Sequence, residues 1–222
     1  MQVKICGITK VDQGCAIAQA GATALGYICV SKSPRYITPR QIAPITAAVA
    51  AEYPEVAHFG VFANASVADM VAIACQANLT TLQLHGDETP ALCQRLRHAL
   101  DMSGLPNVKI VKALRIRETA DLKESQRYEP CVDMLLLDAY HPDQLGGTGK
   151  TLDWRALQDF SSSCPWFLAG GLTPDNVYTA LSLLSPNGID LSSGVERSPG
   201  DKNLDKVHEL FHRLDVLEPR VL

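Results

Sequence analysis

The sequence lacks the features that mark two large classes of protein. Its apolar runs, such as Ala47–Ala51 and Met134–Leu137, are far shorter than the ~20 residues that a membrane-spanning helix needs. Lysines and arginines number 20 against 24 aspartates and glutamates, so the net charge is −4 and a basic surface is missing. We therefore expect neither a membrane nor a nucleic-acid partner.

Recognisable cysteine motifs are also missing, and the first residues do not have the pattern of a signal peptide. The seven cysteines form an odd number at wide spacings without a C-x-x-C pair, which argues against a disulfide framework and a zinc site. Residues Met1–Cys6 contain no basic stretch followed by an apolar one, so we expect no signal peptide. Free thiols favour a cytoplasmic protein, and we expect no metal.

No low-complexity tract or long linker interrupts the chain. Its 222 residues are 46% hydrophobic and 20% charged, which is ordinary usage for a globular protein that buries its own core. We expect a single domain over residues 1–222, with residues 216–222 forming a C-terminal tail.

Short aliphatic runs alternate with Ala- and Leu-rich segments of helical length, a pattern typical of parallel βαβ units. The predicted strands are Val3–Cys6, Ala24–Val30, Val56–Phe62, Thr81–Leu84, Val108–Ala113, Met134–Asp138, Trp166–Ala169 and Gly188–Leu191. The predicted helices are Asp12–Ala20, Pro39–Ala51, Val67–Gln76, Pro90–Leu100, Glu118–Ser125, Trp154–Phe160, Pro174–Leu184 and Asn203–Leu214. Eight such repeats predict an α/β fold, a single-domain (β/α)8 TIM barrel.

Two further features bear on this fold prediction. Several helix starts carry N-cap residues, namely Thr38-Pro39, Thr173-Pro174, Ser66 with an aspartate three residues on, and Asp153. A doubly wound open sheet is the structural alternative. It is less favoured because the turn after the first strand, Cys6–Thr9, has no G-x-G-x-x-G motif.

The active site of a barrel lies at the C-terminal ends of its strands, so residues there are the first candidates for catalysis. Alternation along the first strand puts Lys4 and Cys6 on one face. A nearby ammonium lowers the pKa of a thiol, which would let Cys6 act as nucleophile or base. A buried, inert thiol is an equally good interpretation.

Three more polar residues follow predicted strands. Asp138 ends an apolar strand, where a carboxyl group can act as general acid, and the next helix starts too far downstream for Asp138 to cap it. His85 could be an acid, a base or an orienting residue, or a loop histidine bonded to backbone. Arg35 could clamp a substrate carboxylate, although a lone loop arginine is more often a solvated charge.

Glycine-rich segments supply a candidate phosphate site. Gly146–Thr151 lacks the first glycine of a P-loop, because position 144 is Gln, and a loop over the site is the better interpretation. Ala169–Thr173 and Asp190–Glu196 follow the last two strands, where barrels often bind phosphate through backbone N–H groups. With no dinucleotide motif, the residues favour cofactor-free proton transfer on a sugar phosphate, by an isomerase or a lyase.

Eight segments carry a resemblance to a known family: Val3–Thr9, Lys32–Ile37, Gly60–Phe62, Gln83–Gly86, Leu136–Asp138, Gly146–Thr151, Ala169–Leu172 and Asp190–Glu196. In order and spacing they resemble phosphoribosylanthranilate isomerase over nearly the whole chain. The resemblance implies a (β/α)8 barrel that catalyses a cofactor-free Amadori rearrangement in tryptophan biosynthesis, on a phosphosugar substrate.

The resemblance also implies roles for individual residues. Asp138 would be the general acid that opens the furanose ring, and Cys6 the general base that takes the C2 proton. Arg35 would hold the anthranilate carboxylate, and Asp190 would help to orient that end of the substrate. His85 is a possible orienting residue. The phosphate would be held by Gly170, Gly171, Ser193 and Gly194.

Departures from the family pattern and two alternative functions stay open. Val30-Ser31 stands where an aromatic residue and a proline are expected, and residues 139–145 match poorly. An isomerase of histidine biosynthesis, or a dual-substrate barrel, would resemble a two-carboxylate design with Asp in place of Cys6. A non-catalytic phosphate-binding barrel is the third hypothesis. The sequence leaves a monomer and a homodimer equally open.

Overall fold

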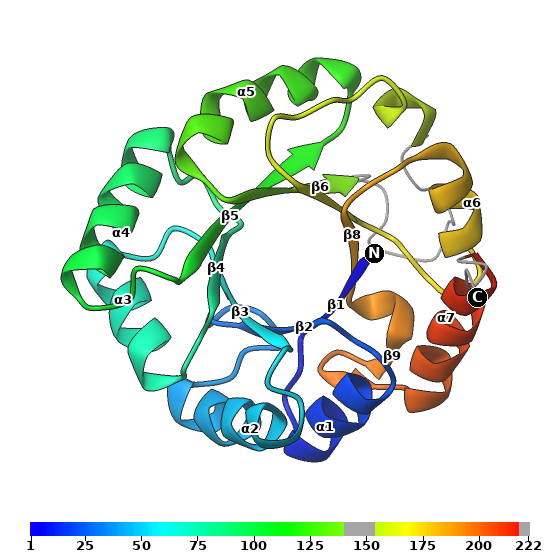
Figure 1. Cartoon of the computed structure of the whole chain (residues 1–222), viewed down its shortest axis with the longest axis horizontal. Coiled ribbons are helices and arrows are strands. Elements are labelled where there is room, and N and C mark those ends of the chain that lie inside the picture. Colours follow the sequence, from blue (N-terminus) through cyan, green and yellow to red (C-terminus); the bar gives the residue numbers. More distant parts are fainter. Residues whose placement is uncertain (140–153, 218–222) are drawn as a thin grey trace.

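The computed structural model describes residues 1–139 and 154–217, in which eight parallel strands close into a barrel surrounded by helices (Figure 1). Each strand pairs with its neighbours in the chain, and the first pairs with the last. The strands are β1 (Gln2–Cys6), β2 (Ala24–Ile28), β3 (Ala57–Phe62), β4 (Thr81–Leu84), β5 (Lys109–Ile116), β6 (Met134–Ala139), β7 (Trp166–Ala169) and β8 (Gly188–Leu191). The predicted fold and all eight predicted strands are confirmed.

The longer helices follow the strands and lie outside the barrel (Figure 1). They are α1 (Val11–Gln19), α2 (Pro39–Glu52), α3 (Val67–Gln76), α4 (Pro90–Met102), α6 (Val177–Leu183) and α7 (Leu204–Leu217). Shorter elements are η1 (Thr119–Glu124), α5 (Ser125–Tyr128), η2 (Glu129–Cys131), η3 (Trp154–Leu157), η4 (Ser193–Val195) and the small strands β9 (Glu196–Ser198) and β10 (Asp201–Lys202). None of the helices in residues 1–139 and 154–217 has the length and apolar character needed to cross a membrane.

Two of the predicted α-helices are wrong in type. The segment expected to be helical over 118–125 is mainly the 3₁₀ helix η1, and the segment expected over 154–160 is only the 3₁₀ helix η3. In η3 the buried side chains are Trp154 and Leu157. Residues three apart lie on one line of a 3₁₀ helix, so a single short turn buries both of them.

The predicted helix starts have different outcomes. Gln41 reaches back to the backbone N–H of Thr38 at the start of α2, and the Ser66 hydroxyl accepts from a backbone N–H at the start of α3. At Thr173 the hydroxyl accepts from the backbone N–H of Asn176, and the Asn176 side chain accepts from the backbone N–H of Thr173, as in a capping box. The helix α6 itself begins three residues later than predicted, at Val177. Asp153 and the Gly146–Thr151 segment lie outside the described residues.

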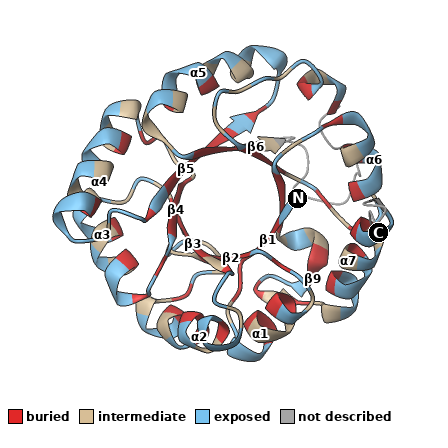
Figure 2. Ribbon diagram, viewed as in Figure 1, coloured by how far each residue is buried: buried red, intermediate tan, exposed pale blue. Residues whose placement is uncertain are grey.

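The hydrophobic core has two layers. Most of it lies between the barrel and the helices, and Figure 2 shows the buried residues along the strands and on the inner faces of the helices. A smaller cluster fills the barrel itself, where Phe59, Leu136 and Phe167 meet. Lys4 points into this interior with its ammonium 5.4 Å from the centre of the Phe59 ring. The interior of the barrel is therefore filled with side chains below the C-terminal ends of the strands.

Candidate active site

A cavity of about 280 Å³ opens at the C-terminal ends of the strands. It brings together residues that the sequence analysis singled out, from six different strand ends. They are Cys6, Arg35, His85, Asp138, Gly170, Gly171, Asp190 and Ser193. A larger hollow of about 770 Å³ beyond His85 contains neither the thiol nor Asp138. The smaller cavity is therefore the candidate active site.

The thiol of Cys6 sits at the end of β1, above a buried ion pair. Lys4 Nζ donates to Asp190 Oδ2 at 2.8 Å, and the Lys4 side chain is fully buried. This pair follows from the register, because barrel closure sets Lys4 directly opposite Asp190 on β8. Burial raises the pKa of the Cys6 thiol, and the positive charge of Lys4 opposes that rise.

The lysine in this pair is charged. Burial works to lower the pKa of Lys4, but the charges of Asp190 and Cys6 outweigh it and raise the pKa above its usual value. The second carboxylate oxygen of Asp190, Oδ1, is buried without a hydrogen-bond partner among the described residues. Asp190 also lines the cavity, so this carboxyl group combines a buried ion pair with a place at the edge of the candidate site.

Asp138 is the penultimate residue of β6 and has a histidine beside it. Its Oδ2 lies 3.3 Å from His85 Nε2, and the other ring nitrogen of His85 lies 3.2 Å from the side-chain amide of Gln83. Both His85 and Asp138 are partly exposed to the cavity. The three side chains form a short relay that would hold the carboxyl group in one orientation.

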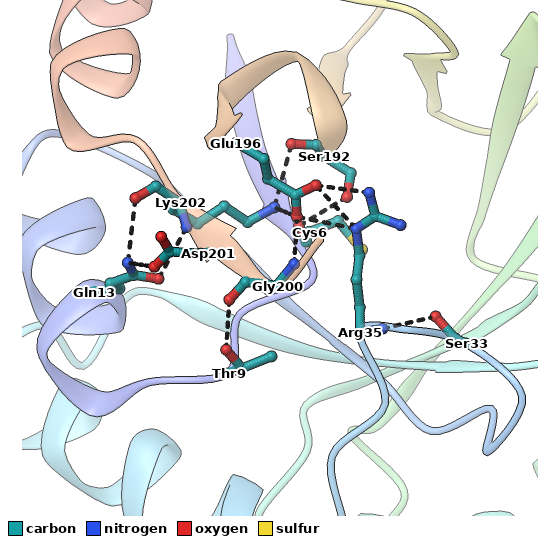
Figure 3. A network of polar contacts seen from close by, with 10 residues as sticks. All are labelled: Cys6, Thr9, Gln13, Ser33, Arg35, Ser192, Glu196, Gly200, Asp201 and Lys202. Atoms are coloured by element: carbon teal, nitrogen blue, oxygen red, sulfur yellow. Dashed lines mark hydrogen bonds and ion pairs between the residues drawn. The ribbon is translucent and has the colours of Figure 1, made fainter. Parts of the chain in front are cut away.

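Arg35 is not the freely solvated charge that a lone loop arginine usually is. Its Nε and Nη2 donate to Glu196 at 2.6–3.1 Å, and Lys202 Nζ donates to the same carboxylate at 2.8 Å (Figure 3). The sequence analysis missed Glu196 and Lys202 as members of the site. Glu196 ends one of the Gly-rich segments, but nothing in its spacing predicts an arginine 161 residues earlier as its partner.

The loops after β7 and β8 border the cavity. Gly170 and Gly171 have φ values of +91° and +64°, which favour glycine. A Cβ atom at Gly194 would overlap the carbonyl oxygen of Leu172, so the two loops touch. Among the described residues, no acceptor is recorded for the N–H groups of Gly171, Ser193 and Gly194. Gly194 stands behind the cavity lining, and the other three predicted phosphate residues line it.

The order of the strands in the barrel determines where the thiol and the carboxyl group lie relative to the glycine-rich loops. Cys6 comes from β1 and Asp138 from β6, and β7 and β8 lie between them in the barrel. The loops after β7 and β8 thus lie between the strand that carries the thiol and the strand that carries the carboxyl group, an arrangement compatible with proton transfer on a phosphorylated molecule. In the described part of the chain, no group of three or more His, Cys, Asp or Glu side chains could hold a metal ion.

Comparisons with known sequences point to one family. The family model described as N-(5'phosphoribosyl)anthranilate (PRA) isomerase matches residues 3–213. A protein of Nostoc punctiforme named N-(5'-phosphoribosyl)anthranilate isomerase is 58% identical over 218 residues, which cover 98% of this chain and 100% of the relative. A protein of the same name from Trichormus variabilis is 57% identical, covering 96% and 98%.

Solved structures agree with the sequence comparisons. The crystal structure of phosphoribosyl anthranilate isomerase from Thermotoga maritima matches with a TM-score of 0.86 at 31% identity, covering 97% of this chain and 99% of that chain. A phosphoribosyl anthranilate isomerase in complex with reduced 1-(o-carboxyphenylamino)-1-deoxyribulose 5-phosphate matches with a TM-score of 0.81 at 29% identity, with the same coverage.

Proposed function

The chain belongs to the N-(5'-phosphoribosyl)anthranilate isomerase family, and from this membership we propose how its own residues carry out the reaction. The reaction is an aldose–ketose isomerisation of tryptophan biosynthesis. It converts N-(5'-phosphoribosyl)anthranilate into 1-(2-carboxyphenylamino)-1-deoxyribulose 5-phosphate. The observation that carries the proposal is the joint position of Cys6 and Asp138 around the cavity that the phosphate loops border.

Asp138 is the general acid of the first step. It gives its proton to the ring oxygen of the furanose as the bond from that oxygen to C1 breaks, and the nitrogen lone pair forms a protonated Schiff base. His85, 3.3 Å away, orients the carboxyl group. An acid held in one position contributes more to the rate than a freely rotating one.

Cys6 is the general base of the second step. Its thiolate takes the proton from C2, and the electrons of that C–H bond move into the Schiff base to give an enolamine. Protonation at C1 and loss of the hydroxyl proton at C2 then give the ketone, so no atoms or electrons are gained from outside. The two steps need no cofactor.

Binding residues flank these two groups. Arg35 holds the anthranilate carboxylate through the donors that Glu196 leaves free, since a guanidinium has five N–H groups. Asp190, which lines the same cavity, helps to orient that end of the substrate. The N–H groups of the loops after β7 and β8, at Gly170, Gly171, Ser193 and Gly194, hold the phosphate.

A fluorescence assay tests the proposal directly. Phosphoribosylanthranilate is generated in situ from anthranilate and phosphoribosyl pyrophosphate, and its consumption is followed. Cys6→Ser and Asp138→Asn should each lower kcat by about 10²–10⁴, the usual contribution of a general acid or base. The matched controls Cys75→Ser and Asp101→Asn change exposed residues and should keep the wild-type rate. Wild-type rates in both site variants would overturn the assignment.

The two alternative functions give different outcomes. An isomerase of histidine biosynthesis, or a dual-substrate barrel, would turn over the aminoimidazole substrate with comparable kcat/KM, and Cys6 in place of a carboxylate argues against this. A binding barrel would hold the phosphorylated ligand tightly without turnover. The pairing of an acid with a base in one cavity favours catalysis over binding alone.

The location of the protein and its oligomeric state are separate predictions. A cytoplasmic location is supported by the seven cysteines, all of which are free. Both a monomer and a homodimer are compatible with the site, which is built from one chain. A related Thermotoga maritima enzyme is described as dimeric. Sedimentation velocity at two concentrations would distinguish the two states.

A further inference from the structure

Arg35 belongs to a cluster of three charged side chains beside the active-site cavity (Figure 3). Glu196 lies at its centre, with a side chain that is only 4% exposed. Its Oε2 accepts from Arg35 Nη2 at 2.6 Å, and its Oε1 accepts from Lys202 Nζ at 2.8 Å and from the backbone N–H of Gly200 at 3.1 Å. One carboxylate thus binds two cations.

Lys202 is the unexpected member of this cluster. Its side chain is fully buried, and its remaining recorded bond is to the carbonyl oxygen of Ser192 at 3.2 Å. It lines no part of the cavity, so it cannot touch a substrate. Gln13 anchors its backbone by donating to its carbonyl oxygen and accepting from its N–H group. The fold therefore positions a buried ammonium directly behind the Arg35–Glu196 pair.

The net charge of the cluster is positive. Arg35 and Lys202 carry two positive charges, and Glu196 carries one negative charge. Burial works to raise the pKa of Glu196, but the hydrogen bonds from Arg35 and Lys202 outweigh it and lower the pKa, so the carboxylate is ionised. The neighbouring Asp201 does not alter the balance, because it is paired with Lys10 at 2.6 Å. One unit of positive charge is left over.

We propose that Glu196 and Lys202 are the positioning residues that make Arg35 specific for a substrate carboxylate. Glu196 holds the guanidinium by Nε and Nη2, which leaves Nη1, with no recorded partner among the described residues, as a donor at the cavity. Lys202 offsets the charge of Glu196, so Arg35 still attracts an anion. The inference rests on the proposed function, in which the anthranilate carboxylate binds Arg35.

Without Lys202 the same geometry would be a poor anion site. Glu196 would then neutralise Arg35 completely, and a second carboxylate would approach a neutral pair that contains an anion. A unit charge acting over roughly 7 Å through an effective dielectric constant of ~20 changes an equilibrium by about 10- to 100-fold. The buried lysine is therefore expected to matter for carboxylate binding and not for binding of the rest of the substrate.

Two ligands that differ only in the carboxylate provide the test. The first is reduced 1-(o-carboxyphenylamino)-1-deoxyribulose 5-phosphate, and the second is its counterpart without the carboxyl group. Their dissociation constants are measured by calorimetry. We expect Lys202→Met to weaken binding of the first ligand about 10- to 100-fold and of the second less than about 3-fold. The control Lys109→Met removes an exposed lysine of β5, outside the cluster, and should change neither.

A double variant separates charge from structure. Lys202→Met with Glu196→Gln removes one positive and one negative charge, so Arg35 again supplies a single positive charge, and the amide oxygen still accepts from it. Binding of the carboxylated ligand should recover to within about 5-fold of wild type. A purely structural role for Lys202 predicts equal weakening for both ligands and no recovery in the double variant, and either result overturns the inference.

Failure of the proposed function would be visible separately. Arg35→Met should abolish the preference for the carboxylated ligand if Arg35 binds the carboxylate. An unchanged preference in that variant would mean that the carboxylate binds elsewhere, whatever Lys202 does. A lost preference in Arg35→Met together with an unchanged one in Lys202→Met would keep the proposed function and refute the role of Lys202.

Discussion

Lys4 is predicted to make Cys6 a usable base, and Lys4→Met tests this. The ammonium is fully buried and is held by Asp190 at 2.8 Å. A Cβ atom at Gly26 would lie 2.6 Å from Cys6 Sγ and 3.1 Å from Lys4 Cε, so those two atoms are within about 5.7 Å of each other. The lysine therefore acts on the thiol at close range, against the burial that raises the pKa of Cys6.

The size of the effect follows from this distance. A unit charge at about 5 Å from a thiolate, with an effective dielectric constant of ~20, contributes about 3 kcal/mol. Its loss lowers the thiolate fraction, and with it kcat/KM near neutral pH, about 100-fold. Burial raises the pKa of Asp190, and loss of the Lys4 charge raises it further, so the carboxyl group takes up a proton more readily in the variant. Leaving that carboxylate buried without its partner also lowers the free energy of unfolding by about 3–5 kcal/mol.

The rate of alkylation by iodoacetamide measures the thiolate fraction of Cys6 independently of the isomerase reaction. The rate is measured at Cys6 by peptide mass spectrometry across the pH range, beside the pH profile of kcat/KM. Because only the thiolate reacts, both profiles should move to higher pH in Lys4→Met. The matched control is Lys112→Met, another buried lysine, whose ammonium lies 3.0 Å from the buried Glu88. It should lose comparable stability with no movement of the Cys6 profile.

Two outcomes would refute this reasoning. An unchanged alkylation profile in folded Lys4→Met would mean that the ammonium does not tune the thiol. An equal shift in Lys112→Met would mean that the lower stability of the barrel, and not the local charge of Lys4, changes the pKa of Cys6.

Two further predictions concern stability and substrate binding. Burial lowers the pKa of His58 to about 4, so its contribution to stability is present above the unfolded-state pKa of about 6.5 and is lost as the pH falls towards 4. Urea unfolding at pH 4.5 against pH 7 should show a loss of about 2–3 kcal/mol that His58→Gln removes and the exposed-site control His98→Gln keeps. Gly194→Ala should raise KM about 10-fold or more with a smaller change in kcat, because its Cβ forces apart the two loops that we propose to hold the phosphate. Gly104→Ala, at a positive φ with open space around it, should leave KM unchanged, and an equal rise in both variants would refute the steric argument.

The sequence predicted the barrel because the information for it is local. Each strand is a short aliphatic run followed by a helical pattern, and eight repeats allow few architectures. The same local logic located the ends of the strands, and alternation predicted that Lys4 and Cys6 share a face. The 3₁₀ helices η1 and η3 were predicted wrongly as α-helices. In such short segments the type of helix depends on tertiary packing more than on the local sequence.

The partners of these residues could not be predicted in the same way. Lys4 and Asp190 are 186 residues apart, and their pairing depends on the register in which β1 meets β8. Arg35 and Glu196 are 161 residues apart and come from two irregular loops. Periodicity carries no information about either pairing. The sequence could therefore nominate single residues, and only the structure could assemble them into a charged network.

The same network gives a physical reason why the proposed base is a thiol. Cys6 is 6% exposed and lies beside Asp190, whose charge Lys4 already neutralises. A carboxylate at position 6 would be a second buried anion sharing one buried cation, and burying a charge without full pairing costs several kcal/mol. A thiol can stay neutral until it is needed, at a much smaller desolvation cost. In the proposed function, the surplus charge of the Arg35 cluster then remains free for the substrate carboxylate, so the proposed base and the proposed carboxylate site are compatible within one small cavity.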